Sequence, residues 1–580
     1  MNQSCFRVKL HHFLDQILRQ VGENLGAKFP YGEMVQYFKT RGEKFAFGEY
    51  WGKLVRGACY AFRYHPTDAL KDALLQTGED MLRVQKENGD LSPVAKERQP
   101  NGLHGSDIWE RKYAVWGLLE LYRTFHIPAF LEGAKREVLY LASQVGNIPK
   151  HPITQTGWAF FGMESSSILD PVMQVYHLTH DENILAFARY IVESGCCGRA
   201  NLFEDILSGI SPKDIGWNGI PEESIAKAYE MTSCMEGLLG YYRATGEEKW
   251  LTCVKTYLDK VISEEITDIG SGGSDLPRNL GPGIGEQWNA TATNYANPQI
   301  RQMMETCVAV YFMKLCYALY TETLDLKYIE QIERTYFNAI LGAISPAQNY
   351  FDYFMTFFGV RGGIAGFAHD IGDMRVSCCS ANGLTGLEMY PELSVFAKED
   401  TLYLNLFLPV ALAIPTKRGT FEATLKSHYP KEGNISLLME SDFLGQLALR
   451  IPCLARSPRL TLNGNPQPFQ RGEYAVLSSL KKGDTVELTF DIPLLSKSVP
   501  GGEGKWLYTY GNLLLARDKR YDEAYDQPMK PAQAYQLLKE GERELVKMQI
   551  GQAVFLDYAS AGSTWDDQSA FSAFVTFLSP

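Results

Sequence analysis

The 580-residue chain lacks any run of about 18 apolar residues, the length that a transmembrane helix needs. Its N-terminus, MNQSCFRVKLHHFLDQIL, has no long apolar stretch and no small-residue cleavage site. A secretory signal peptide is therefore not predicted. We expect a cytoplasmic protein with no membrane partner, and removal of an export signal is the alternative.

An excess of basic residues is also missing. The chain has 56 Lys and Arg against 68 Asp and Glu, which gives a formal net charge of −12. This balance argues against a nucleic-acid partner and against an anionic membrane surface. The remaining composition, 45% hydrophobic and 21% charged, is that of an ordinary globular protein. The length predicts two or three domains.

The eleven cysteines do not form a disulfide framework, because their number is odd and their spacing irregular. The Cys-x2-Cys pairs of zinc fingers are absent as well. In a reducing compartment such cysteines serve as small buried hydrophobes, metal ligands or catalytic groups. We predict that Cys253 and Cys316, inside apolar helices, are core residues, and that the Cys196–Cys197 pair is structural.

A weak repeat is present in the first two-thirds of the chain. Tyr-x-x-Thr segments begin at Tyr176, Tyr242 and Tyr320, each between two stretches of helical apolar periodicity. The pattern predicts a helix, a tight turn and an antiparallel helix, repeated roughly every 60 residues. Five or six such hairpins are typical of a solenoid or a closed (α/α)6 barrel. The uneven spacers favour the barrel, whose loops would build a central pocket.

The pattern changes near residue 396, where short alternating runs are separated by Gly, Asn and Pro turn signals. These runs predict an antiparallel β-sandwich. The expected fold class is therefore α+β and multidomain. We predict an (α/α)6 barrel catalytic domain over 1–395, a β-sandwich over 396–497, and a β-rich segment over 498–580 that packs on the sandwich or the barrel.

Two short segments carry the candidate chemistry. One contains Glu305 and Cys307, and the other, RVSCCSANG, contains Cys378 and Cys379. Three thiols and one carboxylate make a plausible four-ligand zinc set. Both segments precede apolar helices, and a helix N-terminus stabilises a thiolate. Glu305 and Cys307 can converge only if the helix begins between or after them. On the residues alone, packing or a redox role for the cysteine pair stays equally open.

The Glu-x-Cys segment together with Cys-Cys-x-Ala-Asn resembles glycoside hydrolase family 127, which contains β-L-arabinofuranosidases that use a zinc-bound cysteine. The resemblance spans nearly the whole chain and suggests a divergent member. The segments that carry it in the barrel are GEYWGKLVRGACYAF and SDIWERKYAVWGLLELY, and those beyond it are ALRIPCLA, LTLNGN and LDYASAGSTW. The family has an (α/α)6 barrel followed by β-sandwich material.

The resemblance implies Zn²⁺ as cofactor, with Glu305, Cys307, Cys378 and Cys379 as its ligands. It also implies that Cys378 is the nucleophile and that Glu286, in GIGEQWNATATN, is the general acid/base. The implied reaction is retaining exo-hydrolysis that releases a terminal sugar from an oligosaccharide or glycoside. For Glu286, a solvated loop carboxylate is the alternative.

Two pocket positions depart from the family pattern. They are His in arabinofuranosidase members and correspond here to Glu110 and Lys227. The change suggests a different sugar, because Lys227 would suit a carboxylate or another anionic substituent, as in members that act on branched or acidic sugars of pectin. Scaffold ion pairs are the alternative for both residues. The other predicted substrate-binding residues are Trp109, Lys112, Tyr113, Tyr229 and Trp288, with Trp51, Trp158 and His104 as further pocket candidates.

Two other functions stay open at this stage. A sugar epimerase or a lyase-like hydrolase would use the same barrel with His or carboxylate pairs and would need no cysteines. A non-catalytic carbohydrate-binding protein would hold a structural zinc. The sequence leaves the association of chains open, and a homodimer is one possibility.

Overall fold

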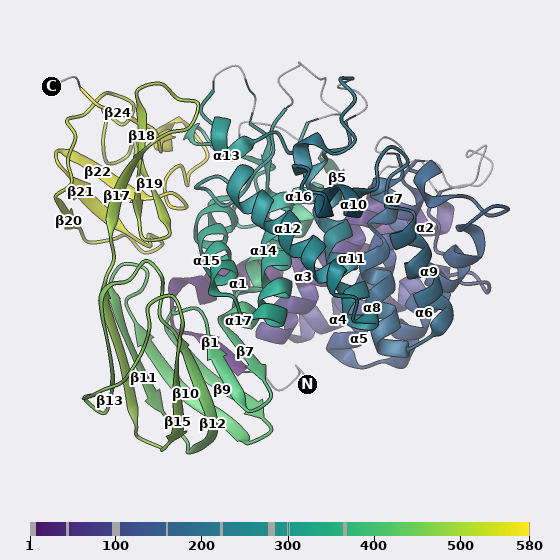
Figure 1. The fold of residues 1–580 in the computed structure, drawn as a ribbon, viewed down its shortest axis with the longest axis horizontal. Helices are drawn as coiled ribbons and strands as arrows, with labels where there is room; N and C mark the ends of the chain where they lie inside the picture. The colour runs from purple at the N-terminus through teal and green to yellow at the C-terminus, as the bar shows by residue number, and fades with distance from the viewer. Residues whose placement is uncertain are drawn as a thin grey trace.

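The computed structural model describes residues 7–41, 46–94, 105–157, 161–220, 224–275, 285–297, 300, 302–362 and 368–578. His104 and Trp158 lie outside these ranges. Within them, a helical region is followed by β-sheet regions (Figure 1). The predicted fold class is confirmed.

In the described part of the chain, six inner helices form a closed ring, since each contacts the next and the last contacts the first. They are α3 (Phe47–Tyr64), α5 (Asp107–Phe125), α8 (Leu169–Thr179), α11 (Ala228–Thr245), α14 (Thr306–Thr323) and α16 (Cys378–Glu388). Most of α3, α5, α11 and α14 is buried on every side, as expected for inner helices. The ring is the inner layer of the predicted (α/α)6 barrel.

The outer layer consists of amphipathic helices that follow or precede the inner ones. They are α1 (Phe13–Val21) with its π-helical continuation η2 (Gly22–Ala27), α4 (Asp68–Val84), α6 (Pro128–Gln144), α9 (Glu182–Glu193), α12 (Glu248–Glu264) and α15 (Leu326–Arg334) with η7 (Thr335–Ile340). Shorter helices lie in the connections: α2 (Tyr31–Thr40), α7 (Met163–Ser166), α10 (Leu202–Leu207), α13 (Thr291–Asn294) and α17 (Tyr390–Ser394).

The Tyr-x-x-Thr repeat lies at the C-terminal end of an inner helix each time. The residue four positions after the Tyr has a left-handed backbone conformation and donates its N–H to the Tyr carbonyl at 2.7 Å. This bond ends the helix and reverses the chain. The pairs are His180 with Tyr176, Gly246 with Tyr242, and Leu324 with Tyr320. An outer helix begins two residues later, so the two helices run antiparallel.

Two sheets form the sandwich that follows the barrel. One has the order β1-β9-β10-β11-β16-β13-β14 and the other β15-β12-β8-β7. Neighbours are antiparallel except β8 and β12, which are parallel. The strands after β1 are β7 (Val395–Lys398), β8 (Thr401–Leu404), β9 (Val410–Thr416), β10 (Gly419–Ser427), β11 (Gly433–Met439), β12 (Phe443–Arg450), β13 (Arg456–Leu462), β14 (Asn465–Pro466), β15 (Tyr474–Leu480) and β16 (Thr485–Asp491).

Strand β1 (Arg7–Leu10) was not predicted from the sequence. It pairs with β9, about 400 residues further along the chain, and Figure 1 shows its purple ribbon among the green sandwich strands. The range 1–395 therefore contains one strand of the sandwich. The domain limits at residues 395 and 497 stay predictions.

The C-terminal segment forms a third sheet that contacts both other regions. Its strands are β17 (Leu494–Ser498), β18 (Lys505–Tyr510), β19 (Leu513–Asp518), β20 (Tyr535–Leu537), β21 (Lys547–Ile550), β22 (Ala553–Asp557), β23 (Phe571–Ser572) and β24 (Val575–Thr576). Strand β4 (Phe358–Gly359) of the barrel region pairs with β23. Buried Arg361 donates to the carbonyl oxygens of Gly342 at 3.0 Å and Ala561 at 2.8 Å. Tyr510 donates to the Lys431 carbonyl of the sandwich.

Two short hairpins lie where α14 and α16 begin. They are β2 (Met304–Glu305) with β3 (Phe354–Met355), and β5 (His369–Ile371) with β6 (Met374–Val376). In the described ranges, every helix is too short or too polar to cross a membrane.

Candidate metal centre

The candidate ligands come from two helix starts. Glu305 ends strand β2 and precedes α14, with extended backbone angles, and Cys307 lies in the first turn of α14. Cys378 and Cys379 are the first two residues of α16, where the Ser377 side chain accepts the N–H of Ser380 at 3.0 Å. The helix begins between Glu305 and Cys307, as their convergence requires. The change from strand to helix turns both side chains toward one point.

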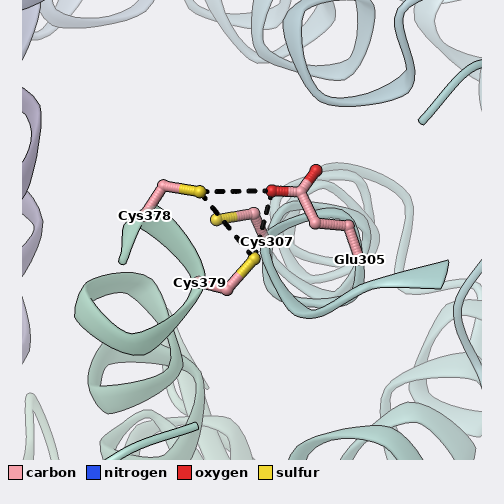
Figure 2. A group of neighbouring side chains, drawn as sticks. All are labelled: Glu305, Cys307, Cys378 and Cys379. Atoms are coloured by element: carbon pink, nitrogen blue, oxygen red, sulfur yellow. Dashed lines mark hydrogen bonds between the residues drawn. The ribbon is translucent and has the colours of Figure 1, made fainter. Parts of the chain in front are cut away.

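Figure 2 shows the four side chains pointing toward one another from these two segments. One oxygen of Glu305 and the three sulfurs all lie within 4.8 Å of one another. Glu305 Oε1 is 3.6 Å from Cys378 Sγ and 3.1 Å from Cys379 Sγ, and the two sulfurs are 3.9 Å apart. Neighbouring ligand atoms of a tetrahedral zinc site are about 3.5–3.8 Å apart. The group could therefore hold a metal ion of that geometry.

Burial dominates the electrostatics of this group. It raises the pKa of Glu305, Cys378 and Cys379 well above the ordinary values. For Cys307, burial is outweighed by hydrogen bonds to the other two thiols and by the Lys53 ammonium, so the pKa falls to about 7. A divalent cation at the centre would favour the ionised form of all four residues.

Three residues next to the cluster were not predicted from the sequence. The Tyr353 hydroxyl lies 3.1 Å from Cys378 Sγ. Lys53 Nζ lies 3.4 Å from Cys307 Sγ and 2.5 Å from Glu49 Oε1. Glu49 and Lys53 are four residues apart in the mostly apolar first half of α3, and that spacing could have indicated a buried ion pair. Nothing in the sequence pattern marks Tyr353.

The predicted acid/base residue, Glu286, lies beside the cluster and forms an ion pair with Lys227. Their side chains are only 11% and 12% exposed, so Glu286 is not a solvated loop carboxylate. The backbone N–H of Ala228 donates to the Glu286 carbonyl at 3.1 Å and fixes the loop. After burial, the Glu286 charge is the next cause that raises the pKa of Glu305. Lys227 thus forms its ion pair with Glu286 and not with Glu110.

Glu110 caps helix α3 from inside the barrel. Its side chain is 0% exposed, and its oxygens accept the backbone N–H groups of Ala46 at 2.7 Å, Glu49 at 3.3 Å and also Gly48. Burial raises its pKa to about 8. The sugar contact of Glu110 stays a prediction. The complete burial of the side chain does not favour it.

Lys112 and three of the predicted aromatic residues lie together in the barrel interior. Lys112 Nζ donates to Ser167 at 2.9 Å and Ser233 at 2.8 Å, and it lies 4.5 Å from the Trp109 ring centre. The ring of Trp109 packs edge-on against Tyr113 at 5.2 Å and Tyr229 at 5.7 Å. This group is next to the cluster, because Lys53 Nζ also lies 4.5 Å from the Tyr229 ring centre.

Trp288 and Trp51 are not part of that group. Both are fully buried, and their indole N–H groups point toward outer helices. Trp288 Nε1 donates to Tyr257 of α12 at 3.0 Å, and Trp51 Nε1 donates to Thr77 of α4 at 2.9 Å. The structure places these two indoles in the barrel wall, and the substrate contact of Trp288 stays a prediction.

Two family models match the chain. The β-L-arabinofuranosidase GH127 catalytic domain matches residues 3–392, and the β-L-arabinofuranosidase GH127 middle domain matches residues 401–492. The chain belongs to glycoside hydrolase family 127. It is therefore a glycoside hydrolase, which sets aside the epimerase and the non-catalytic alternatives. No curated protein matches the chain.

Solved structures show the same fold for this GH127 member. A GH127 β-L-arabinofuranosidase from Geobacillus stearothermophilus T6 aligns with a TM-score of 0.76 and 15% identity, over 99% of this chain and 100% of that one. A second GH127 β-arabinofuranosidase aligns with a TM-score of 0.75 and 16% identity, over 100% of this chain and 97% of that one. The barrel and the sheets are thus arranged as in these structures.

Proposed function

We propose that this GH127 enzyme is a zinc-dependent, retaining exo-glycosidase. Cys378 is the nucleophile, Glu286 is the general acid/base, and Glu305, Cys307, Cys378 and Cys379 hold the zinc. The observation that carries the proposal is the convergence of three sulfurs and one carboxylate oxygen within 4.8 Å. Thiolate-rich tetrahedral sets select zinc among the common divalent metals.

The exposure of the thiols supports Cys378 as the nucleophile. Cys378 is partly exposed, whereas Cys307 and Cys379 are buried. Bound zinc would supply the positive charge that keeps these thiols ionised. Cys379 and Cys307 would then serve as fixed ligands, and Cys378 is the sulfur that a sugar can approach.

The reaction takes place in two displacements. In the first, Cys378 Sγ bonds to the anomeric carbon while the bond from that carbon to the leaving oxygen breaks, and Glu286 gives its proton to that oxygen. In the second, Glu286 takes a proton from water, the water oxygen bonds to the anomeric carbon, and the carbon–sulfur bond breaks. Two inversions retain the anomeric configuration.

The substrate is a terminal sugar of the β-L-arabinofuranose type or a branched or acidic sugar. Lys227 supports the acidic sugar, because its ammonium lies at the Glu286 carboxylate and is 12% exposed. An ammonium there could also bind a carboxylate on the sugar. An acidic sugar of pectin side chains is therefore our preferred substrate class.

The deciding experiment compares the wild type with Cys378→Ser on aryl glycosides and pectin side-chain oligosaccharides. Cys378→Ser should lose more than about 10³-fold in kcat with an unchanged circular dichroism spectrum, because a serine hydroxyl is not ionised at neutral pH. Cys453→Ser, at an exposed cysteine far from the cluster in sequence, is the control and should keep full activity. Near-normal turnover in Cys378→Ser would exclude this nucleophile.

Metal analysis is the second arm of the same experiment. Elemental analysis of freshly purified, reduced protein should find about one zinc per chain, and Cys307→Ala should lose it. The absence of zinc from the wild type would leave a structural cysteine cluster as the better explanation.

A further inference from the structure

Lys53 is a buried cation beside the proposed zinc ligands. It lies on α3, its side chain is 1% exposed, and its ammonium is 2.5 Å from Glu49 Oε1. The same nitrogen lies 3.4 Å from Cys307 Sγ. A buried lysine that needed only an ion pair would be satisfied by Glu49. The additional contact with a sulfur places the ammonium between the carboxylate and the cluster.

Two other contacts fix this orientation. The second oxygen of Glu49 accepts the indole N–H of Trp109 at 2.8 Å. Glu110 holds the first turn of α3, including the backbone N–H of Glu49. The position of the Lys53 ammonium is therefore set by α3 and α5, whereas the sulfur that it contacts belongs to α14.

We propose that Lys53 is a positioning residue for the metal centre: its ammonium donates a hydrogen bond to the Cys307 thiolate and holds that sulfur as a permanent metal ligand. The proposal rests on the zinc site of the proposed function. Three thiolates and a carboxylate exceed the charge of a divalent ion by two negative charges. A buried excess charge is costly unless a cation or hydrogen-bond donors lie next to it.

The contact also separates the roles of the three cysteines. In the described residues, Lys53 is hydrogen-bonded to Cys307 and not to Cys378. The ammonium offsets the charge of the buried Cys307 thiolate, and a thiolate that accepts an N–H bond is also less reactive toward a carbon atom. Cys307 is thereby a stable ligand and a poor nucleophile. Among the described residues no ammonium is hydrogen-bonded to Cys378, whose sulfur lies next to the neutral Tyr353 hydroxyl instead.

The test measures zinc affinity rather than activity. Lys53→Met is titrated, in reduced protein, against a chromophoric zinc chelator. It should lose about 10- to 100-fold in zinc affinity, the usual effect of removing a hydrogen-bond partner from a ligand. Lys53→Arg keeps a cation with N–H donors and should stay within a few-fold of the wild type. In the cobalt(II)-substituted protein, Lys53→Met should move the thiolate-to-metal charge-transfer band to longer wavelength.

Lys314→Met is the matched control. Lys314 is also on an inner helix, is 10% exposed, and pairs with Glu236 at 3.1 Å. Its ammonium lies 4.2 Å from the Tyr311 ring centre, much as Lys53 lies over Tyr229. The difference is that Lys53 contacts a thiol. Lys314→Met should therefore keep wild-type zinc affinity even if it is less stable.

The outcomes separate this proposal from the function on which it rests. Unchanged zinc affinity in Lys53→Met, or an equal loss in Lys314→Met, would overturn the role of Lys53 and leave the zinc site intact. A wild type that binds no zinc would overturn the proposed function itself. If Lys53→Met does not fold, Lys53→Gln replaces it. That variant keeps a polar side chain without the positive charge and should lose several-fold in zinc affinity, and an unchanged affinity would refute the proposal.

Discussion

The ion pair between Lys227 and Glu286 has a direct consequence for specificity. The pair lies beside the cysteine cluster, and both side chains are nearly buried. The family resemblance of the sequence implies His in arabinofuranosidase members at the position of Lys227. A neutral imidazole cannot offer the fixed charge of an ammonium, whereas an ammonium can bind a carboxylate that is brought in by the substrate.

We therefore predict that Lys227→His changes substrate preference. A buried hydrogen bond between charged groups contributes about 1.5–3 kcal/mol. The variant should lose about 10- to 100-fold in kcat/KM on carboxylate-bearing glycosides and much less on neutral arabinofuranosides. The ratio of kcat/KM for the two substrate classes is the measurement. An equal loss on both classes would show that Lys227 serves Glu286 alone.

Glu388, the last residue of α16, is a buried acid far from the chemistry. It is 1% exposed, and neither oxygen has a hydrogen-bond partner within the described residues. Burial is the cause that raises its pKa well above the ordinary value of 4.5. The folded protein keeps this proton at pH values where the unfolded chain has released it. Stability contributed by this residue is therefore lost as the pH rises above 4.5.

Glu388→Gln should remove that pH dependence. At pH 3 the wild type and the variant should have similar free energies of unfolding, because the acid is then neutral in both the folded and the unfolded state. At pH 8 the variant should be more stable by on the order of 1 kcal/mol or more. Urea unfolding at the two pH values measures the difference. A constant gap between the two proteins would show that Glu388 is ionised in the folded state.

Some residues of the metal centre could be predicted from the sequence, and others could not. Adjacent cysteines and a Glu-x-Cys segment before apolar helices made these four residues candidate ligands, because helix starts have a recognisable pattern, and the family resemblance then favoured the metal over packing or a redox role. Tyr353 and Lys53 come from other elements, and their approach depends on tertiary packing. The pattern also gave Trp288 as a pocket residue, but its orientation depends on a contact with α12.

At the scale of elements, the N-terminus of α3 is held by a side chain from α5. The α3 N-cap residue, Ala46, has no side chain that could cap the helix. Glu110 takes that place and accepts N–H groups of the first turn. A remote carboxylate cap leaves no local sequence signal, so the expectation for Glu110 came from the family resemblance, as a sugar contact or a scaffold ion pair.

Glu110→Ala should therefore destabilise α3. Uncapped, buried N–H groups cost about 1–3 kcal/mol, so the free energy of unfolding should fall by about 2 kcal/mol or more. Glu132→Ala, at an exposed position of α6, is the control and should change it by less than about 0.5 kcal/mol. Denaturant unfolding gives both values. A rise in KM without any loss of stability would indicate the sugar contact instead.

Helices and turns that have a recognisable local sequence pattern could be predicted, whereas a strand that depends on distant pairing could not. The Tyr-x-x-Thr turns could be found because each reversal uses the same left-handed residue after an apolar helix. Strand β1 has four residues and depends on its pairing with β9. No local pattern distinguishes so short a strand from a coil.

At the scale of the whole molecule, one carboxylate joins the three regions. Glu333 of α15 accepts Arg450 Nη2 of β12 at 2.8 Å and Asn512 Nδ2 of the C-terminal sheet at 2.6 Å. The side chains of Arg450 and Glu333 are both 0% exposed. Figure 1 shows α15 at the border between the barrel and the sheet regions. Breaking this contact should therefore affect the assembly of the regions.

Arg450→Met is the final prediction. It would leave the Glu333 charge buried without its partner, which typically costs about 3–5 kcal/mol. The thermal unfolding midpoint should fall clearly, as measured by calorimetry. Glu333→Gln in the same chain removes the stranded charge and still accepts from Asn512, so the double variant should recover part of the loss. The surface pair of Arg418 with Asp400, 59% and 43% exposed, gives the control, and Arg418→Met should cost less than about 1 kcal/mol. Equal effects at the two sites would mean that the buried pair does not hold the regions together.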